Sequence, residues 1–198
     1  MERSSHLTSI DAIASAIEPL TPALGRMSSP DGALTLMLSD IAEADAFESR
    51  VGPERWAQLL SDHHLLVERL VGHHDGAVVK VERDGFLASF NSAHGGLYAA
   101  LELQRTFTSA RNEDAAQALA LRIGLHSGFV ISNSDELLGR NVVLATRIAA
   151  RAHAGEILVS STLKRYTESD PSFRFEPRGE HHFKGLHGEH AVYSVAWR

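Results

Sequence analysis

The sequence contains no cysteine among its 198 residues. This excludes disulfides, thiolate metal sites and a cysteine nucleophile, and it fits a reducing cytoplasm, where we expect the protein to act. No apolar run approaches the roughly 20 residues of a membrane span, and the first residues lack the basic and apolar blocks of a secretory signal. We therefore expect a cytoplasmic protein without a membrane span.

Basic charge is also scarce, because 19 Lys and Arg residues stand against 25 Asp and Glu, for a net charge of -6. Without a basic field, nucleic acid is not an expected partner, although a local patch of cations could still hold a nucleotide. The 43% hydrophobic and 22% charged residues are ordinary for a globular protein. The length suffices for one substantial core.

The first part of the chain differs from the rest. Residues 1–32 are predicted to be an appendage or linker, and residues 33–198 to form the main domain. Ile10 and Ile13 belong to a set of apolar residues at helical spacing that stops before Pro19, which predicts a short helix. The helix either docks on the domain or belongs to a partly ordered tail, and the sequence does not favour one over the other.

Two acidic residues stand where strands are predicted to end. Asp40 lies near the end of the apolar run Ala33–Ile41, which indicates a strand buried on both faces. Asp84 and Gly85 form the tight turn of a hairpin predicted over 77–90. Two such carboxylates suit a pair of divalent cations on a polyphosphate, because Mg²⁺ and Mn²⁺ prefer hard oxygen ligands. A solvated turn residue is the alternative for Asp84.

Helical and strand patterns alternate along the remaining chain. Helices are predicted from Pro53 to about Leu70, around 97–107 and over 141–152, and strands over 119–125, 129–132, 155–160 and 191–196. The glycine-containing segment 124–128 is predicted to close one strand before the next returns beside it. This order predicts an α/β (α+β) fold with a mixed sheet covered by helices.

Six stretches, in this order, resemble the catalytic domain of class III nucleotidyl cyclases, the adenylyl and guanylyl cyclase family. They are the segments 38–41, 80–85, 122–128, 139–147, 155–160 and 183–185. The similarity runs from about residue 33 to residue 195 and is closest to bacterial members. It implies a ferredoxin-like mixed sheet, the catalytic fold of that family.

The resemblance also implies an activity. The chain would be an adenylyl cyclase, in which the ribose 3′-hydroxyl of ATP attacks the α-phosphate, giving cyclic AMP and pyrophosphate. Asp40, Ile41 and Asp84 are implied to bind two metal ions per site, Mg²⁺ or Mn²⁺. Two chains are implied to form a homodimer, with the active sites shared between them.

Four further residues match functional positions of the family. Lys80 stands at the adenine-reading lysine, and Glu136 stands at the position of its acidic partner. Arg147 matches the arginine that stabilises charge at the transferring phosphate, and Lys184 matches a lysine that contacts the terminal phosphates. A salt bridge on a helix surface is the alternative for Arg147.

The sequence departs from the family at three positions. Val143 replaces the asparagine that orients the ribose, and the loss of one such donor costs about 10²–10³ in rate. Asn141 lies about 200° around the helix from it and is not a substitute. Arg83 and Asp45 replace a glycine and a threonine. Arg83 either pairs with Asp84 in place of a metal or turns outward, with Asp45 capping the following helix.

These departures leave two other interpretations open. One is a catalytically impaired cyclase-fold module that dimerises, binds nucleotide or transmits a signal. The other is a heterodimer in which this chain supplies the metal aspartates and another cyclase supplies the asparagine.

The twelve histidines include three adjacent pairs, at 63–64, 73–74 and 181–182. Neighbours on a helix or strand point in different directions, so we interpret these pairs as exposed residues and not as metal sites. His126 lies beside the predicted sheet core, and we expect it to be buried and hydrogen-bonded.

Overall fold

The computed structural model describes residues 9–15, 32–113, 119–129 and 135–197. Its seven strands form one mixed sheet in the order β2-β3-β1-β4-β5-β7-β6, in which β4 and β5 run parallel and the other neighbours run antiparallel. The strands are β1 (Ala33–Ile41), β2 (Gly76–Glu82), β3 (Gly85–Phe90), β4 (Leu121–Phe129), β5 (Glu156–Ser160), β6 (Phe175–His181) and β7 (His190–Val195). The helices are α1 (Ser9–Ser15), α3 (Ala44–Val51), α4 (Pro53–His73), α5 (Ala93–Glu113), α6 (Asp135–Ala149) and α7 (Ser161–Thr167).

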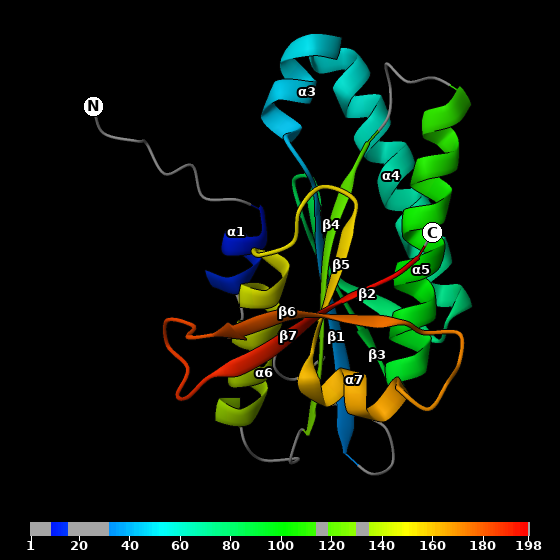
Figure 1. Cartoon of the computed structure of the whole chain (residues 1–198). Helices are drawn as coiled ribbons and strands as arrows, with labels where there is room; N and C mark the ends of the chain where they lie inside the picture. The colour runs from blue at the N-terminus through cyan, green and yellow to red at the C-terminus, as the bar shows by residue number, and fades with distance from the viewer. Residues whose placement is uncertain (1–8, 16–31, 114–118, 130–134, 198) are drawn as a thin grey trace.

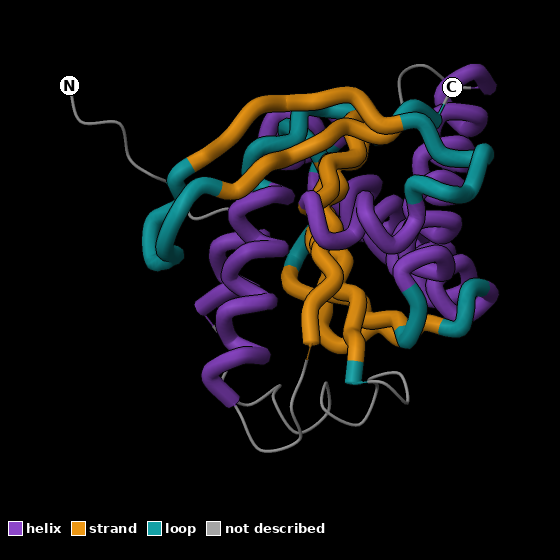
Figure 2. The backbone as a smooth tube through the Cα atoms, turned by 60° about the horizontal axis from the view of Figure 1, so that its bottom comes forward, coloured by secondary structure: helices purple, strands orange, loops and turns teal. Residues whose placement is uncertain are grey.

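Helices cover both faces of this sheet, as Figure 1 and Figure 2 show, with α4 and α5 on one side and α1 and α6 on the other. The side chains of β1 alternate between the two layers, as the strand geometry requires. Leu36 and Leu38 pack with α1 and α6, whereas Met37 and Ile41 pack with α4 and α5. The predicted fold class, a mixed sheet covered by helices, is confirmed.

The N-terminal helix docks on the sheet. Ile10 and Ile13 of α1 are fully buried against Leu34, Leu87 and the inner side of α6. The helical spacing in the sequence therefore identified both the helix and its apolar side, and the structure selects the docked alternative over the tail.

Strand β4 differs from its prediction. It runs without a break through segment 124–128, so the expected return strand does not begin at Phe129, and residues 130–134 lie outside the described part of the chain. The glycines serve close packing instead of a turn. A Cβ atom at Gly124 would lie 2.3 Å from the backbone nitrogen of Ala149, so its absence lets α6 rest directly on the strand.

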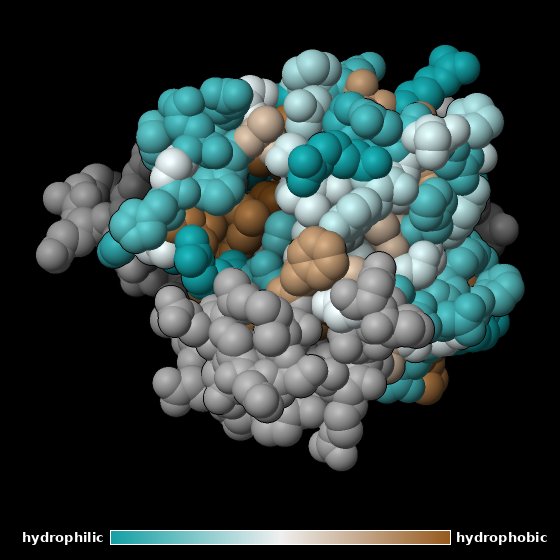
Figure 3. Space-filling view, turned by 90° about the horizontal axis from the view of Figure 1, so that it is seen from below, coloured by the Kyte–Doolittle hydropathy of each residue, from teal (hydrophilic) through white to brown (hydrophobic). Residues whose placement is uncertain are grey.

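One face of the surface is largely hydrophilic, as expected for a globular protein of ordinary composition. Viewed from the lower end of Figure 1, hydrophilic residues dominate and hydrophobic colour shows mainly in a hollow between them (Figure 3). Among the described residues, no helix combines the length and the apolar character that crossing a bilayer requires.

Candidate active site

The carboxyl end of β1 and the turn between β2 and β3 meet at a pocket of about 620 Å³. Asp40 and Ile41 line it from β1, and Asp84 lines it from the turn. The structure thus places the three predicted metal-binding residues at one pocket. Ser9 of α1 and Arg122 of β4 also line it, and neither was predicted as a site residue.

Asp40 is almost completely buried, with 1% of its surface exposed. Strand pairing sets Asp40 opposite Arg122, and the guanidinium forms a two-pronged contact: Nε donates to Oδ1 at 2.7 Å, and Nη2 donates to Oδ2. A buried carboxylate needs such a charge-assisted pairing to offset its desolvation. Arg122 therefore fixes the orientation of this carboxylate and balances its charge.

Asp84 is buried by the docking of α1. The two-residue turn Arg83–Asp84 joins β2 to β3, and the Ser9 hydroxyl donates a hydrogen bond to Asp84 Oδ1. The packing is tight enough to need a glycine next in sequence, since a Cβ atom at Gly85 would lie 2.8 Å from the Ser9 Cβ. The alternative of a solvated turn aspartate is excluded, because only 7% of Asp84 is exposed.

Arg83 turns outward. Its backbone adopts a φ of 52°, a left-handed conformation that a non-glycine residue takes up only under constraint, and its guanidinium pairs with Asp45 Oδ1 at 3.3 Å. Of the alternative in which Arg83 turns outward and Asp45 caps the following helix, the capping part is wrong. Helix α3 begins at Ala44 with Glu43 as its N-cap, so Asp45 already lies in the first turn and faces the pocket.

The pocket fits divalent cations in its donor chemistry. Asp40 and Asp84 offer four carboxylate oxygens, each with two lone pairs, so a carboxylate can accept from Arg122 or Ser9 and still bind a hard cation. Ile41 lines the same pocket.

Lys80 lies on the sheet face that α1 and α6 cover. Strand β2 contains a bulge between Val78 and Lys80, beyond which Lys80 pairs with Leu87, a residue packed against α1 and α6. Its ammonium group lies 3.6 Å from Glu82 Oε2, and 23% of the side chain is exposed. Lys80 does not line the pocket that contains Asp40 and Asp84.

Arg147 and Lys184, which were predicted to contact phosphate, do not line this pocket either. Arg147 lies in the last turn of α6, where its Nε atom is buried and has no hydrogen-bond partner among the described residues. Val143 precedes it by one helical turn. Lys184 is exposed in the connection from β6 to β7, and Glu136 lies in the first turn of α6 with a side chain outside the described set.

Asn141 faces β4, as its position around the helix predicts. Its amide donates to the Phe129 carbonyl at 3.0 Å, and its Oδ1 lies 3.2 Å from His126 Nε2. His126 Nδ1 lies 2.8 Å from the Ser160 hydroxyl, so the expected buried, hydrogen-bonded histidine is confirmed. Burial lowers the pKa of His126 to about 4, with the Asn141 hydrogen bond opposing the shift and His190 adding to it.

No direct signal in the sequence marked Arg122 or Ser9 as site residues. Arg122 lies at a position between the alternating apolar residues of its strand. Only the register of β1 against β4 sets it opposite Asp40. Ser9 lies in the segment interpreted as an appendage, 75 residues from Asp84 in sequence. A basic residue among buried strand positions was the one available hint for Arg122.

Comparison with known proteins identifies the family of the chain. The model of the adenylate and guanylate cyclase catalytic domain matches residues 27–196. "Putative adenylate cyclase 3" of Rhizobium meliloti (strain 1021) is 31% identical over 144 residues, which is 72% of this chain and 23% of that protein. An uncharacterized protein of Mycobacterium bovis is 30% identical over 134 residues, 67% of this chain and 44% of the relative. The chain thus spans less than half of these relatives.

Solved structures share the fold. The adenylyl cyclase CyaB from P. aeruginosa superposes with a TM-score of 0.73 at 20% identity, covering 83% of this chain and 93% of that one. An adenylate/guanylate cyclase/hydrolase from Silicibacter pomeroyi gives a TM-score of 0.69 at 24% identity, covering 82% and 95%. Because the family model matches most of this chain, the chain belongs to the family of adenylate and guanylate cyclase catalytic domains.

Proposed function

We propose that this chain is an adenylyl cyclase that converts ATP to cyclic AMP and pyrophosphate, with a rate reduced by Val143. The observation that carries the proposal is the convergence of two buried carboxylates, Asp40 and Asp84, at one pocket. A pure scaffold has no need to bury two acids side by side, since each costs desolvation free energy.

The protein side of the mechanism begins with these carboxylates. Two divalent cations, Mg²⁺ or Mn²⁺, bound there would lower the pKa of the ribose 3′-hydroxyl and neutralise charge on the triphosphate. Arg122 orients Asp40 and balances its charge, and Ile41 borders the same site. The start of α3 lines the pocket without a side-chain cap, so its first N–H groups are suited to phosphate oxygens.

Base recognition is assigned to Lys80 and Glu136. An ammonium group suits an adenine ring nitrogen, and a carboxylate suits the exocyclic amino group, so this pair favours ATP over GTP. At the transferring phosphate, the guanidinium of Arg147 stabilises the developing charge. A phosphate oxygen would give the buried Nε of Arg147 a partner. Lys184, exposed on its loop, contacts the terminal phosphates.

The site is proposed to be completed by a second copy of the chain. Lys80, Arg147 and Lys184 do not line the carboxylate pocket of their own chain. Two chains related by a two-fold axis would bring the carboxylates of one to the cations of the other, twice in each homodimer. A heterodimer with another cyclase is the variant in which the partner also supplies the missing asparagine.

A module without catalysis is the second candidate. It is favoured by Val143 and by the neighbourhood of the carboxylates, where Arg83 is bound to Asp45 and Ser9 is bound to Asp84. In that case the pocket binds nucleotide, or α1 relays a signal, without turnover.

Cyclic AMP formation by the purified chain decides between the two. ATP is supplied with Mg²⁺ and separately with Mn²⁺, and GTP is tested as the alternative substrate. Asp40→Asn and Asp84→Asn are matched controls, because they keep side-chain volume and remove the charge. Turnover that both controls lose supports the cyclase. Nucleotide binding without turnover, at high protein concentration and with either metal, supports the module.

A further inference from the structure

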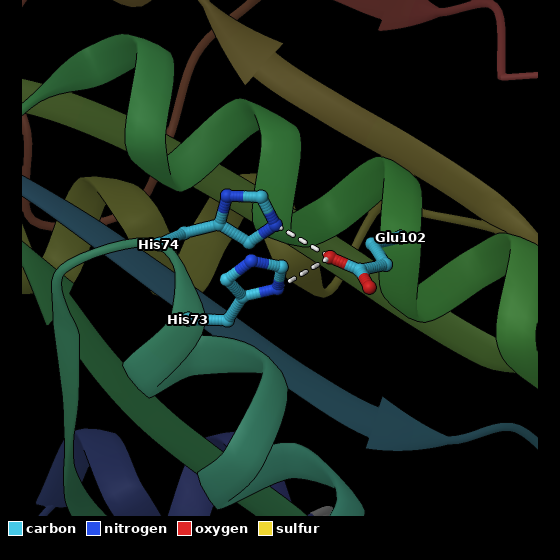
Figure 4. Close-up of side chains that lie close together, drawn as sticks. All are labelled: His73, His74 and Glu102. Atoms are coloured by element: carbon cyan, nitrogen blue, oxygen red, sulfur yellow. Dashed lines mark hydrogen bonds and ion pairs between the residues drawn. The ribbon is translucent and has the colours of Figure 1, made fainter.

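Helix α4 ends at a second group of metal-binding side chains, far from the carboxylate pocket. His73 is its last residue, His74 is its C-cap, and both rings face Glu102 of α5 (Figure 4). His74 Nε2 lies 2.6 Å from Glu102 Oε2, and His73 Nδ1 lies 3.7 Å from the same oxygen. All three donor atoms lie within 4.8 Å of one another.

The end of the helix explains why adjacent histidines face the same way. Neighbours inside an α-helix point about 100° apart, which is why the sequence argued against a shared site. His74 instead has φ of -104° and ψ of 31°, so the chain leaves the helix between the two residues. The rings then stack, with centroids 5.0 Å apart and planes inclined by 27°. The expectation that both residues are exposed and point in different directions is wrong for this pair, because the two rings face one carboxylate and only His73 is exposed.

We propose that His73, His74 and Glu102 bind one divalent transition-metal ion of the Zn²⁺ class. Two imidazole nitrogens and one carboxylate oxygen form a ligand set that Zn²⁺ accepts, with solvent in the fourth position. His73 is 70% exposed and leaves that position open to water. Mg²⁺ does not compete well, because it prefers oxygen ligands.

Two of the three ligand separations require only a small adjustment, and the third, between His73 and His74, lies within 4.8 Å. Ligands 2.0–2.1 Å from a tetrahedral Zn²⁺ lie about 3.3 Å from one another. The His73 to Glu102 separation of 3.7 Å is close to this value, and the His74 to Glu102 separation of 2.6 Å must open by less than 1 Å. Glu102 is 38% exposed, so its carboxylate is free to rotate by that amount.

Neighbouring groups hold His74 in place. The Tyr98 ring stacks on it at 6.3 Å, and the Tyr98 hydroxyl is itself fixed by a 2.8 Å hydrogen bond to Asp170. A Cβ atom at Gly95 would lie 2.8 Å from the His74 carbonyl oxygen, which shows how closely α5 rests on this corner. The carboxyl end of the 21-residue α4 also favours a cation electrostatically.

This site is independent of the proposed cyclase activity. His74 precedes β2 and Asp84 follows it, and a strand of seven residues separates the two ends by roughly 20 Å. A metal bound by His73, His74 and Glu102 would join the end of α4 to α5. A hydrogen bond between His74 and Glu102 alone would not require the His73 ring to face the same carboxylate.

The test measures Zn²⁺ binding to the chelator-treated full chain by calorimetry, in millimolar Mg²⁺ so that oxygen-only sites are filled. One Zn²⁺ per chain is expected. His73→Ala, His74→Ala and Glu102→Gln should each weaken the affinity by at least about tenfold, because each removes one of three ligands. His182→Ala is the matched control: His182 lies 3.0 Å from Glu189, so it has a carboxylate partner in a pair and not in a group of three.

Thermal unfolding gives a second measurement. Free Zn²⁺ at 100 times its Kd should lower the unfolding equilibrium constant about 100-fold in the unmodified chain and not in the His73→Ala variant. His73 is largely exposed, so this variant keeps the test valid even if His74→Ala fails to fold. The proposal is overturned by the absence of stoichiometric binding, or by ligand variants that bind Zn²⁺ as tightly as the His182→Ala control.

Discussion

The two faces of the sheet differ in what they bury. The face under α4 and α5 is mainly apolar, with Trp56, Phe86 and Phe107 in its core, and its buried polar residues include His63, Gln104, Thr35 and Ser39. The face under α1 and α6 carries most of the polar residues that are proposed to take part in catalysis. The side chains on that face, or at its edge, include Asp40, Lys80, Arg122 and His126.

The difference shows how the fold separates stability from function. Gly124 and Gly128 lie on the face that α1 and α6 cover, where the lack of a Cβ atom lets α6 pack closely on β4. The short helix α1 covers another part of the same face. Changes on the α4 and α5 face should therefore alter the free energy of unfolding. Changes on the α1 and α6 face should mainly alter catalysis, and the following predictions test that division.

Asp40→Asn should have the largest effect. It removes the charge that is proposed to bind cations and leaves Arg122 facing a neutral amide, so we expect cyclic AMP formation to fall at least about 10²–10³-fold. Circular dichroism should show a folded protein. Retention of more than a tenth of the turnover would contradict the role of Asp40.

Val143→Asn should raise turnover by about 10²–10³ with ATP, because it restores a donor one helical turn before Arg147. Val143→Ala is the control, since it changes volume without adding a donor and should give no gain. Equal rates in the two variants would mean that Val143 does not limit catalysis.

Mixing two inactive chains should restore activity if sites are shared between copies. An Asp40→Asn chain and an Arg147→Ala chain each form dead homodimers, but their mixed dimer has one intact site out of two. Random association in an equal mixture then gives about a quarter of the unmodified activity. No recovery, with mixed dimers shown by mass measurement, would contradict the shared site.

His63→Leu should act on stability alone. The buried ring of His63 packs against Phe86 and Phe107, and its nitrogens have no hydrogen-bond partner among the residues that the structure describes. Removing an unsatisfied polar group of this kind should stabilise the fold by about 1–3 kcal/mol at pH 7 in urea unfolding. An exposed substitution, His182→Ala, should change little.

The same residue predicts a pH dependence. Burial, with a smaller contribution from neighbouring His64, lowers the pKa of His63 from 6.5 to about 3. The unfolded chain therefore binds the extra proton first, and stability should fall as pH drops below about 6.5, by up to about 1.4 kcal/mol per pH unit. His63→Leu should remove this part of the slope, and an unchanged slope would contradict the assignment.

Ser9→Ala should have the smallest effect. It removes the hydroxyl that donates to Asp84 but keeps Ile10 and Ile13 docked, so we expect a loss of about 1 kcal/mol in unfolding free energy. The same measurement on Ser49→Ala, which removes a hydroxyl contact on the exposed side of α3, is the comparison.

Much of the fold was predictable because local patterns decide it. The strand Ala33–Ile41 was identified with its observed bounds, since a run buried on both faces is apolar almost throughout. Helix α4 was placed correctly by Pro53 and by the spacing of Trp56 and Leu70. Strand β6 was not predicted, because its residues are largely exposed and show no apolar alternation.

The sequence by itself determined the composition of the core, the helix and strand periods, and the acidic residues placed where strands end. Tertiary structure decided which side chains meet. The pairing of Asp40 with Arg122 depends on strand register, the contact of Ser9 with Asp84 depends on docking of a distant helix, and the facing rings of His73 and His74 depend on where a helix ends. The first two contacts join residues 82 and 75 positions apart in sequence, so no local pattern encodes them, and the third depends on the exact residue at which α4 ends.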